Sequence, residues 1–316
     1  MNRITFTFIL FVSVCLATAF ITQPPGKKVR TKAALGKMLF SDKGLSKDSS
    51  VSCASCHKPD FAFADTVAFS TGIGGKPTSR NTPSVLNMTS RPYFFWDGRA
   101  PSLEAQALMP IENPDEMGVP VHEVVARLNR SPEYVKIFQR VFNSKPNASN
   151  MAAAFSAFER TLETVDSKFD YFSNNKGELS EQEERGRELF VGDKAKCFDC
   201  HFKVDFTDDS FKNIGLYNGK DLNDAGRYLI TGDSLDRGKF KTPGLRNVAV
   251  TAPYMHNGMF ETLDQVLAYY NAPGHFIDGA LNIDSALRQP LRLTPAEKKD
   301  IIAFLKTLTD KAYVRP

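Results

Sequence analysis

The sequence predicts a mostly α-helical, loop-rich fold made of two similar domains. Helix-start signals recur along the chain, whereas alternating strand patterns are nearly absent. The same short motifs also occur twice in the same order, about 150 to 160 residues apart. A period of that length is typical of two duplicated domains and not of a short-repeat solenoid.

Paired motifs define the repeat. They are G-x-x-L-F at 36–40 and 186–190, C-x-x-C-H at 53–57 and 197–201, TPSVLN at 82–87 and TPGLRN at 242–247, PYFFWDG at 92–98 and PYMHNG at 253–258, and SLEAQAL at 102–108 and TLDQVLAYY at 262–270. Trp96 stands where the second copy has His256. We expect one domain over 30–170 and a second over 178–316, with the last helix able to pack back on the first domain.

Capping signals place the individual helices. Proline at a first helical position, or Ser/Thr followed three residues later by Glu/Gln, marks most of the starts. The expected helices lie at 131–142, 151–165, 180–190, 262–270 and 294–308. The segment 174–178 is polar and contains a glycine, and we interpret it as a linker.

The N-terminus has the pattern of a secretory signal peptide over residues 1–19. Arg3 precedes an apolar run that ends before the small residues of Ala17-Thr18-Ala19. The run is shorter than the roughly 20 residues of a membrane-spanning helix. Cys15 leaves a lipid anchor as an alternative, although Val14 is larger than the residue that usually precedes a lipidated cysteine. The sequence thus predicts export to the periplasm, without a membrane span after cleavage.

Composition sets limits on the partners. With 316 residues and 42% hydrophobic content, the chain can bury one large core or two ordinary ones. The net charge is only +4, and the sequence contains no run of like charges. Nucleic-acid binding needs clustered Lys and Arg, so no nucleic-acid partner is expected.

Both C-x-x-C-H motifs are typical of covalent c-type haem attachment. The two cysteines form thioethers to the porphyrin vinyl groups, and the adjacent histidine ligates iron. The residues are Cys53, Cys56 and His57 in the first copy, and Cys197, Cys200 and His201 in the second. A zinc site would not explain the paired histidines, and disulfides across this spacing are usually redox-active in a thioredoxin-like context that is missing here. We predict two covalent haems, each in a cytochrome c-like domain.

The residue opposite each iron-ligating histidine decides whether the haem is open or closed, because a sixth ligand there would occupy the iron's second face. No histidine occurs between His57 and His122, and His122 lies in a helical run typical of a surface residue. The nearest methionines to the first site are Met88, Met109 and Met117, and its acidic neighbours are Glu104, Glu112, Asp115 and Glu116. An open haem beside a carboxylate suits acid–base chemistry on peroxide. The second site offers Met255, His256, Met259, Tyr269 and Tyr270, and spacing does not choose among them.

The chain resembles the bacterial di-haem cytochrome c peroxidases and the related MauG proteins from about residue 35 to 308. The matching motifs are LGKMLFSDKGLS, SVSCASCH, SRNTPSVLN, FFWDGRAPSLEAQA, PIENPDEMG, CFDCH and KTPGLRNVAVTAPYMHNG. The resemblance implies that His57 and His201 are proximal iron ligands and that Trp96 carries electrons between the haems. It also implies that Glu116 is the catalytic acid–base and that Gln106 lies in the distal pocket. Asn81, Thr251 and Pro253 match the ligands of a calcium ion, for which oxygen donors are suitable.

Two positions depart from the peroxidase pattern. Many of these peroxidases have a histidine in S-x-G-H-G that closes the first haem, and this chain has Ile73 there. Isoleucine cannot ligate iron, so we expect an open first haem even in the oxidised protein. Fourteen residues beyond His256, where peroxidases commonly have methionine, the chain has Tyr270, as MauG-type proteins do.

These features predict a periplasmic di-haem peroxidase. It would reduce hydrogen peroxide with electrons from a small cytochrome c or cupredoxin, and relatives of the peroxidase type are usually dimers. One alternative is a MauG-like oxidase that acts through a high-valent iron state on a protein or small molecule. A second is an electron-transfer cytochrome with both irons closed.

Overall fold

The computed structural model describes residues 29–314, so the expected signal peptide and Cys15 lie outside the described part. The helices are α1 (Lys32–Phe40), α2 (Cys53–Cys56), α3 (Leu103–Glu112), α4 (Val121–Arg130), α5 (Pro132–Phe142), α6 (Ala148–Glu159), α7 (Lys168–Ser173), α8 (Glu181–Val191), α9 (Tyr228–Thr231), α10 (Leu263–Asn271) and α11 (Pro295–Thr307). The strands described are β1 (Phe211–Lys212) and β2 (Phe240–Lys241), which pair antiparallel. The mostly helical, loop-rich fold expected from the sequence is confirmed.

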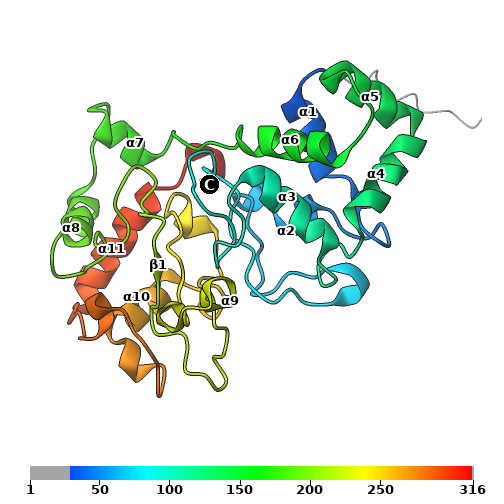
Figure 1. The fold of residues 1–316 in the computed structure, drawn as a ribbon. Coiled ribbons are helices and arrows are strands. Elements are labelled where there is room, and N and C mark those ends of the chain that lie inside the picture. The colour runs from blue at the N-terminus through cyan, green and yellow to red at the C-terminus, as the bar shows by residue number, and fades with distance from the viewer. Residues whose placement is uncertain (1–28, 315–316) are drawn as a thin grey trace, which may run out of the picture.

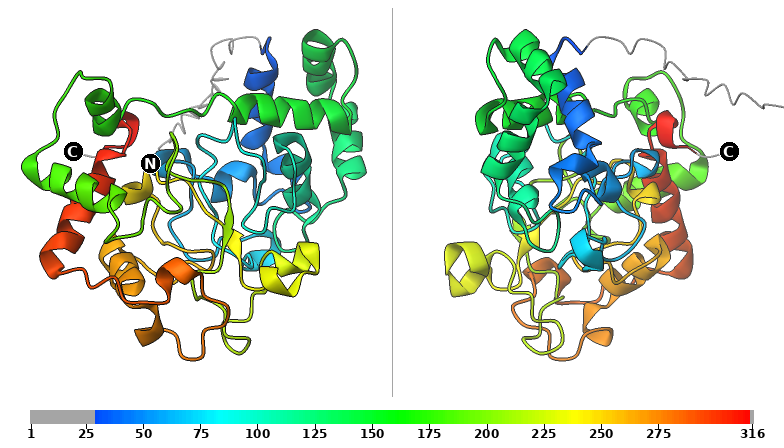
Figure 2. Two further views of the ribbon diagram at one scale, coloured as in Figure 1. Left: turned by 60° about the vertical axis from the view of Figure 1, so that its left-hand side comes forward. Right: turned by 90° about the vertical axis from the view of Figure 1, so that its right-hand side faces the viewer.

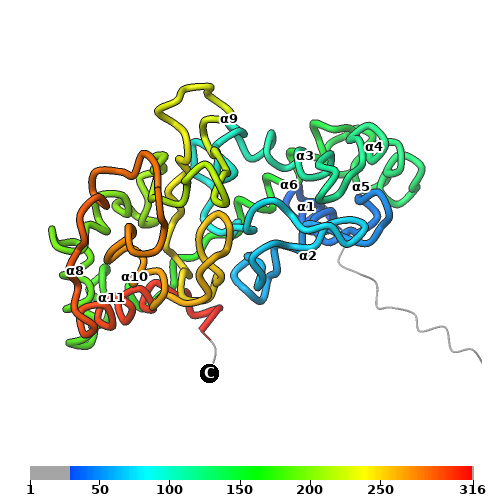
Figure 3. The backbone as a smooth tube through the Cα atoms, turned by 90° about the horizontal axis from the view of Figure 1, so that it is seen from below, coloured from blue at the N-terminus to red at the C-terminus, as the bar shows by residue number. Residues whose placement is uncertain are grey.

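Most helices fall into two groups that lie side by side. Helices α1 and α4 to α6 form one group, and α7, α8, α10 and α11 form the other (Figures 1 and 2). Long loops fill the space between the groups, and the view from below shows the same separation (Figure 3). Each group has its own hydrophobic core, one around Leu35 and Phe155 and the other around Phe190 and Phe304.

The two groups pack their helices in the same way. Helix α1 crosses α6 so closely that a Cβ on Gly36 would lie 1.9 Å from the carbonyl oxygen of Ala154. Helix α8 crosses α11 at the same separation, with Gly186 against the carbonyl oxygen of Asp300. Only glycine permits such an approach of two backbones. The G-x-x-L-F motifs are therefore the helix-crossing points of a duplicated unit.

Loop geometry repeats as well. Isolated β-bridges join Phe94 to Ala100 and Tyr254 to Phe260, at equivalent places in the two motif series. Asn87 and Asn247 both adopt a positive φ, and their backbone N–H groups donate to the carbonyl oxygens of Leu162 and Leu308. These contacts set the register of the repeat, in which the end of α6 corresponds to the end of α11.

Four predicted helices are confirmed to within one or two residues, as α5, α8, α10 and α11. The predicted bounds of the helix at 151–165 were wrong. Helix α6 begins at Ala148 because Asn147, not Asn150, accepts the capping hydrogen bond. It ends at Glu159 because the Thr161 hydroxyl donates to the Phe158 carbonyl and closes the last turn.

Helix α11 packs against α8 and α10, and Tyr313 just beyond it lies against the first core. Ion pairs also join the two halves of the chain. Arg80 contacts Asp97 at 2.6 Å and Asp224 at 2.7 Å, and Arg91 contacts Asp205 at 2.6 Å. None of the helices described is long and apolar enough to cross a membrane.

Candidate functional site

A cavity of about 450 Å³ lies between the two helix groups, within the range of ligand pockets in proteins. Both C-x-x-C-H motifs line it. So do residues from the loops at 78–99 and 240–256, which meet at its centre. The repeat therefore brings its two chemically distinctive motifs to one continuous space.

The first motif is folded by local hydrogen bonds. Ser52 and Ser55 form a reciprocal capping box around the single turn of α2, which holds Cys53 and Cys56 on that turn. His57 follows as the C-cap, and its Nδ1 lies 3.1 Å from the carbonyl oxygen of Phe63. A carbonyl oxygen only accepts, so Nδ1 carries the proton and Nε2 keeps its lone pair free.

The second motif repeats this arrangement. The Nδ1 atom of His201 donates to the carbonyl oxygen of Phe206 at 2.8 Å. Burial lowers the pKa of both His57 and His201, which keeps the imidazoles neutral. All four motif cysteines are free thiols. Neutral imidazoles oriented by backbone carbonyls, each beside two unpaired thiols on an open cavity, fit covalent haem with Nε2 as iron ligand.

Glu116 lies on the first half of the cavity wall, in the loop after α3. The Asn113 side-chain amide donates to the Glu116 Oε1 at 2.7 Å. The Ile73 N–H donates to the backbone carbonyl oxygen of Glu116 at 2.9 Å. Burial raises the pKa of Glu116, partly offset by Asn113 and the charge of Arg99. The charge of Glu116 contributes to the raised pKa of the Cys53 and Cys56 thiols, so the carboxyl lies near the first motif. Gln106, from α3, lines the same cavity.

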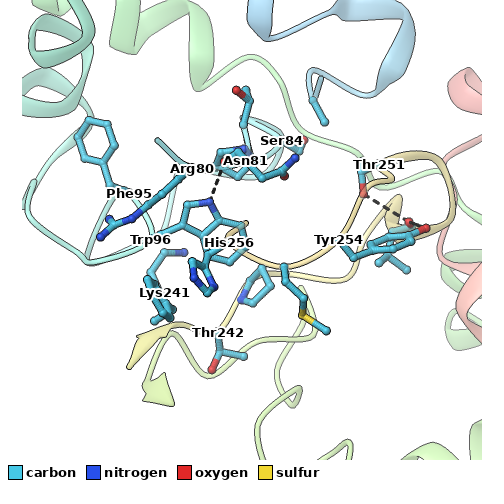
Figure 4. Close-up of a pocket in the computed structure, with 18 of the residues that line it drawn as sticks. Arg80, Asn81, Ser84, Phe95, Trp96, Lys241, Thr242, Thr251, Tyr254 and His256 are labelled. Carbon is cyan, nitrogen blue, oxygen red and sulfur yellow. Dashed lines mark hydrogen bonds between the residues drawn. The ribbon is translucent and has the colours of Figure 1, made fainter. Parts of the chain in front are cut away.

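Trp96 lies where the two halves meet. Its Nε1 donates to the carbonyl oxygen of Asn81 at 2.9 Å, and its own carbonyl accepts from the backbone of Lys241 at 2.7 Å (Figure 4). The carbonyl of His256 accepts from the N–H of Asn81 at 2.7 Å. The Trp96 backbone is thus hydrogen-bonded to Lys241 in the second copy. Its indole is hydrogen-bonded to Asn81, which is itself hydrogen-bonded to His256 in the second copy.

His256 is buried and stacks on Phe240, with ring centroids 3.7 Å apart. Burial lowers its pKa to about 4, so the ring is neutral. The structure places it beside Trp96 (Figure 4).

The two adjacent tyrosines of α10 have different surroundings. Tyr269 is fully buried, and its hydroxyl donates to the carbonyl oxygen of Ile214 at 2.5 Å. Tyr270 lines the cavity, and its hydroxyl has no hydrogen-bond partner among the residues described here. Burial raises its pKa. Of the methionine candidates, Met255 lines the cavity and Met259 is surface-exposed.

The residues expected to bind calcium lie close to this junction. Thr251 and Pro253 line the cavity with Asn81. The Asn81 amide nitrogen donates to the carbonyl oxygens of Val67 and Ala68 at 3.2 Å each, so the amide oxygen, Oδ1, takes no part in these two contacts. Across the described chain, no group of three or more His, Cys, Asp or Glu side chains is arranged to hold a metal.

Comparison with known proteins supports the same assignment. The family model described as di-haem cytochrome c peroxidase matches residues 30–178. The methylamine utilization protein MauG of Methylorubrum extorquens is 41% identical over 282 residues, covering 88% of this chain and 78% of that protein. This chain belongs to the di-haem cytochrome c peroxidase and MauG family. Membership of this family implies two haems.

Other members of the family resemble the chain over similar lengths. The cytochrome c551 peroxidase of Nitrosomonas europaea is 36% identical, covering 88% of this chain and 79% of that protein. A crystal structure of a MauG-like protein associated with microbial copper homeostasis superposes with a TM-score of 0.83 at 35% identity, covering 90% of this chain and 91% of the other. Peroxidases and MauG proteins both occur among the similar proteins, so similarity alone does not choose between the two activities.

Some functional contacts were missed by the sequence reasoning. The carbonyl groups that orient His57 and His201 belong to Phe63 and Phe206, and backbone acceptors have no sequence signature. Glu159, a buried carboxylate on the cavity wall, was also missed. Alignment of the two copies through α6 and α11 could have found it, because the equivalent residue is Leu305.

Proposed function

We propose that the protein is a di-haem peroxidase that reduces hydrogen peroxide to water at the haem on Cys53, Cys56 and His57. The reaction consumes one peroxide, two electrons and two protons and yields two waters. The observation that carries the proposal is Glu116, a half-buried carboxyl with a raised pKa on the wall of the cavity that the first motif also lines. A carboxyl in that place can exchange protons with a small substrate held beside His57.

The haem, when bound, supplies the iron at which the O–O bond breaks. Glu116 acts as the acid–base: its Oε1 is held by Asn113, which leaves Oε2 to take a proton from one peroxide oxygen and return it to the other. Gln106, on the same wall, can donate to the peroxide and orient it. Arg99, whose charge acts on Glu116, favours the carboxylate form before peroxide arrives.

Electrons enter through the haem on Cys197, Cys200 and His201, and Trp96 links the two halves. Support for this path is the position of Trp96, hydrogen-bonded to Asn81 and Lys241 at the junction. The donor is a small cytochrome c or cupredoxin in the periplasm. Calcium held by Asn81, Thr251 and Pro253 would rigidify the same junction, and two copies of the chain would form the working dimer.

The first haem is open because Ile73 replaces a ligand. The Ile73 side chain lies against Gly118 and does not line the cavity. Met88 and Met117 do line it, both packed among core residues. If either methionine closed the iron, the protein would be an electron-transfer cytochrome. The ferric protein should show a high-spin absorption spectrum, and a purely low-spin spectrum would contradict the open site.

A MauG-like oxidation of a protein or small molecule is the second candidate. Tyr270 favours it, because its free hydroxyl on the cavity suits iron ligation at the second haem. Such an enzyme would react with peroxide yet turn over slowly with a reduced cytochrome.

Steady-state turnover of peroxide with reduced cytochrome c tests the proposal. Glu116→Gln should lower kcat/KM for peroxide by about 10²-fold or more, because an amide cannot shuttle the proton. Asp115→Asn is the matched control, since Asp115 is the adjacent acid and its side chain is 50% exposed. Negligible turnover by the wild-type protein would sink the peroxidase and leave the MauG-like reaction. Equal rates in both variants would remove Glu116 from its role.

A further inference from the structure

Glu159 and Leu305 occupy the same position in the two halves of the fold. Phe158 and Phe304 both lie against the glycine of a G-x-x-L-F motif, on α6 and α11 respectively. Three residues later, Thr161 and Thr307 each donate a hydroxyl to the carbonyl of their phenylalanine at 2.6 Å. Glu159 and Leu305 are the next residues after these phenylalanines, and both line the cavity. The first half therefore has a carboxyl where the second half has an apolar side chain.

The Glu159 residue is buried, and its carboxyl reaches the cavity without a hydrogen-bond partner among the described residues. The residue is 5% exposed, and its side chain has no hydrogen bond or ion pair to any other residue in the described range. A buried, unpaired carboxylate is costly, and proteins usually avoid one unless it has a function. Leu305 shows that the fold itself accepts an apolar residue at this position.

Few charges act on Glu159. Burial raises its pKa to about 8, the charge of Arg160 lowers it, and that of Glu104 raises it. Arg160 and Glu104 pair with each other at 2.7 Å on the surface, so their effects largely cancel. Helices α1 and α4, which also pack against α6, contribute no charge that acts on it. The proton on Glu159 therefore responds mainly to its desolvated surroundings and to charge placed in the cavity.

The charge of Glu159 reaches the first haem position in particular. Among the charged groups that affect the Cys53 thiol, Glu159 has the largest effect, ahead of Glu116. Cys53 is where the first porphyrin would be attached. The iron–porphyrin core of a ferric haem carries one positive charge that reduction removes, and in a low-dielectric cavity that change acts strongly on a nearby carboxyl.

We infer that Glu159 is the proton acceptor coupled to reduction of the first haem. When the ferric iron gains one electron from the second haem, the Glu159 carboxylate gains one proton from solvent, and no other bond changes. The charge of the cavity then stays constant during the electron transfer. The second haem lacks this coupling because Leu305 cannot titrate. The inference rests on the proposed haem at Cys53, but not on peroxide turnover.

The pH window follows from the burial of Glu159. Burial raises the pKa of Glu159 to about 8 without haem, and the uncharged iron–porphyrin core of a ferrous haem does not favour the carboxylate. The ferric haem favours the carboxylate, so the pKa of Glu159 is lower beside the ferric haem than beside the ferrous haem. Between these two values the midpoint potential of the first haem should fall by up to about 59 mV per pH unit, the value for one proton per electron.

Spectroelectrochemical titration of the haem-loaded protein from pH 6 to 9 tests the inference. The wild-type first haem should show the slope, and the Glu159 variants should leave the pH dependence of the second haem unchanged. In Glu159→Gln and in Glu159→Leu, the potential of the first haem should change with pH at no more than half of the wild-type slope. This potential should equal the wild-type value at pH 6 and exceed it at pH 9. Glutamine preserves the shape of the glutamate side chain, and leucine reproduces the residue that the second half has at this position. If one variant misfolds, the other still tests the inference. An undiminished slope in a folded variant would overturn the inference.

Glu116 is the competing titratable group on the same cavity. Glu116→Gln should retain the wild-type slope, and loss of the slope in that variant would transfer the role to Glu116. Reduced-minus-oxidised infrared spectra add a second readout, since a protonated-carboxyl band should appear on reduction and vanish in Glu159→Gln. A preparation without covalent haem on Cys53 would contradict the proposed site itself. A haem-loaded protein with a flat potential would contradict only the coupling.

Discussion

Ile73 donates its backbone N–H to the carbonyl oxygen of Glu116 at 2.9 Å. Its side chain fills the space above Gly118, where an added Cβ would lie 2.2 Å from the Ile73 Cδ1. Ile73, the residue proposed to leave the first iron open, is therefore also part of the support of the proposed acid–base.

Gly118→Ala should uncouple Ile73 from the Glu116 loop. The new methyl group would displace the Ile73 side chain, and such overpacking costs about 1–3 kcal/mol. Gly118 also has a φ of +60°, which strains alanine by about 1–2 kcal/mol. We expect kcat/KM for peroxide to fall while the rate of reduction of the second haem by its donor stays unchanged.

Gly74→Ala is the matched control for that variant. Gly74 has a φ of +63°, but a Cβ there would meet no atom within 4 Å. Backbone strain is thus common to both variants, and only Gly118→Ala places a new atom against the Ile73 side chain. Equal losses of kcat/KM in the two would show that the Ile73 contact does not matter. Thermal unfolding of both proteins measures the shared strain.

The pH dependence of turnover should report Glu116. The carboxylate is the form that accepts the first proton, and burial raises its pKa. Activity should therefore be full above this pKa and fall as the pH drops through it, on the alkaline side of a free glutamate. Asp115→Asn should move this acid limb to lower pH, because the charge of Asp115 raises the pKa of Glu116. An acid limb that stays in place in Asp115→Asn, or persists in Glu116→Gln, would assign it to another group.

Much of the fold could be predicted because helix starts are local. Ser180 and Thr262 cap α8 and α10 through bonds to residues three positions on, which are visible as sequence patterns. The bounds of α6 were wrong because its start depended on which of Asn147 and Asn150 accepts the capping bond. Both residue types can cap a helix, so the pattern alone did not decide.

The cavity residues were harder to predict than the helices. Tyr269 and Tyr270 are the same residue type at adjacent positions, and only the family resemblance favoured Tyr270. The packing of α10 binds the Tyr269 hydroxyl to Ile214 and leaves Tyr270 on the cavity wall. Arg80 lies in the SRNTPSVLN motif, but the motif does not indicate that its guanidinium pairs with Asp97 and with Asp224, which is 144 residues further along the chain. Long-range pairs of this kind depend on how the two halves meet, which short motifs do not encode.

Trp96→Phe should separate peroxide chemistry from electron supply. The phenyl ring cannot donate to the Asn81 carbonyl, and it lacks the extended indole at the junction. In stopped-flow mixing, peroxide should oxidise the first haem as fast as in the wild type, while re-reduction through the second haem slows. Tyr93→Phe on the same segment is the control, because Tyr93 is exposed and loses only a hydroxyl. Unchanged re-reduction in Trp96→Phe would exclude the tryptophan path.

Tyr270→Phe should change the second haem, and Tyr269→Phe should not. Removing the Tyr270 hydroxyl deletes the proposed oxygen ligand, so the absorption spectrum should change and the potential of that haem should rise. Tyr269→Phe instead loses a buried hydrogen bond to Ile214, at a cost of about 1 kcal/mol in the free energy of unfolding. If Tyr269→Phe altered the spectrum and Tyr270→Phe did not, the ligand assignment would be reversed.

Arg80→Ala should loosen the junction between the two halves more than any surface ion pair does. The Arg80 side chain is 14% exposed and pairs with Asp97, which is 5% exposed, and with Asp224. Removing one member of a buried ion pair costs up to about 3–5 kcal/mol, and here Asp224 loses its partner while Asp97 keeps only Arg99. Arg160→Ala breaks an exposed pair with Glu104 and should cost less than about 1 kcal/mol. Urea unfolding of both variants measures the difference, and similar midpoints would mean that the junction does not depend on Arg80.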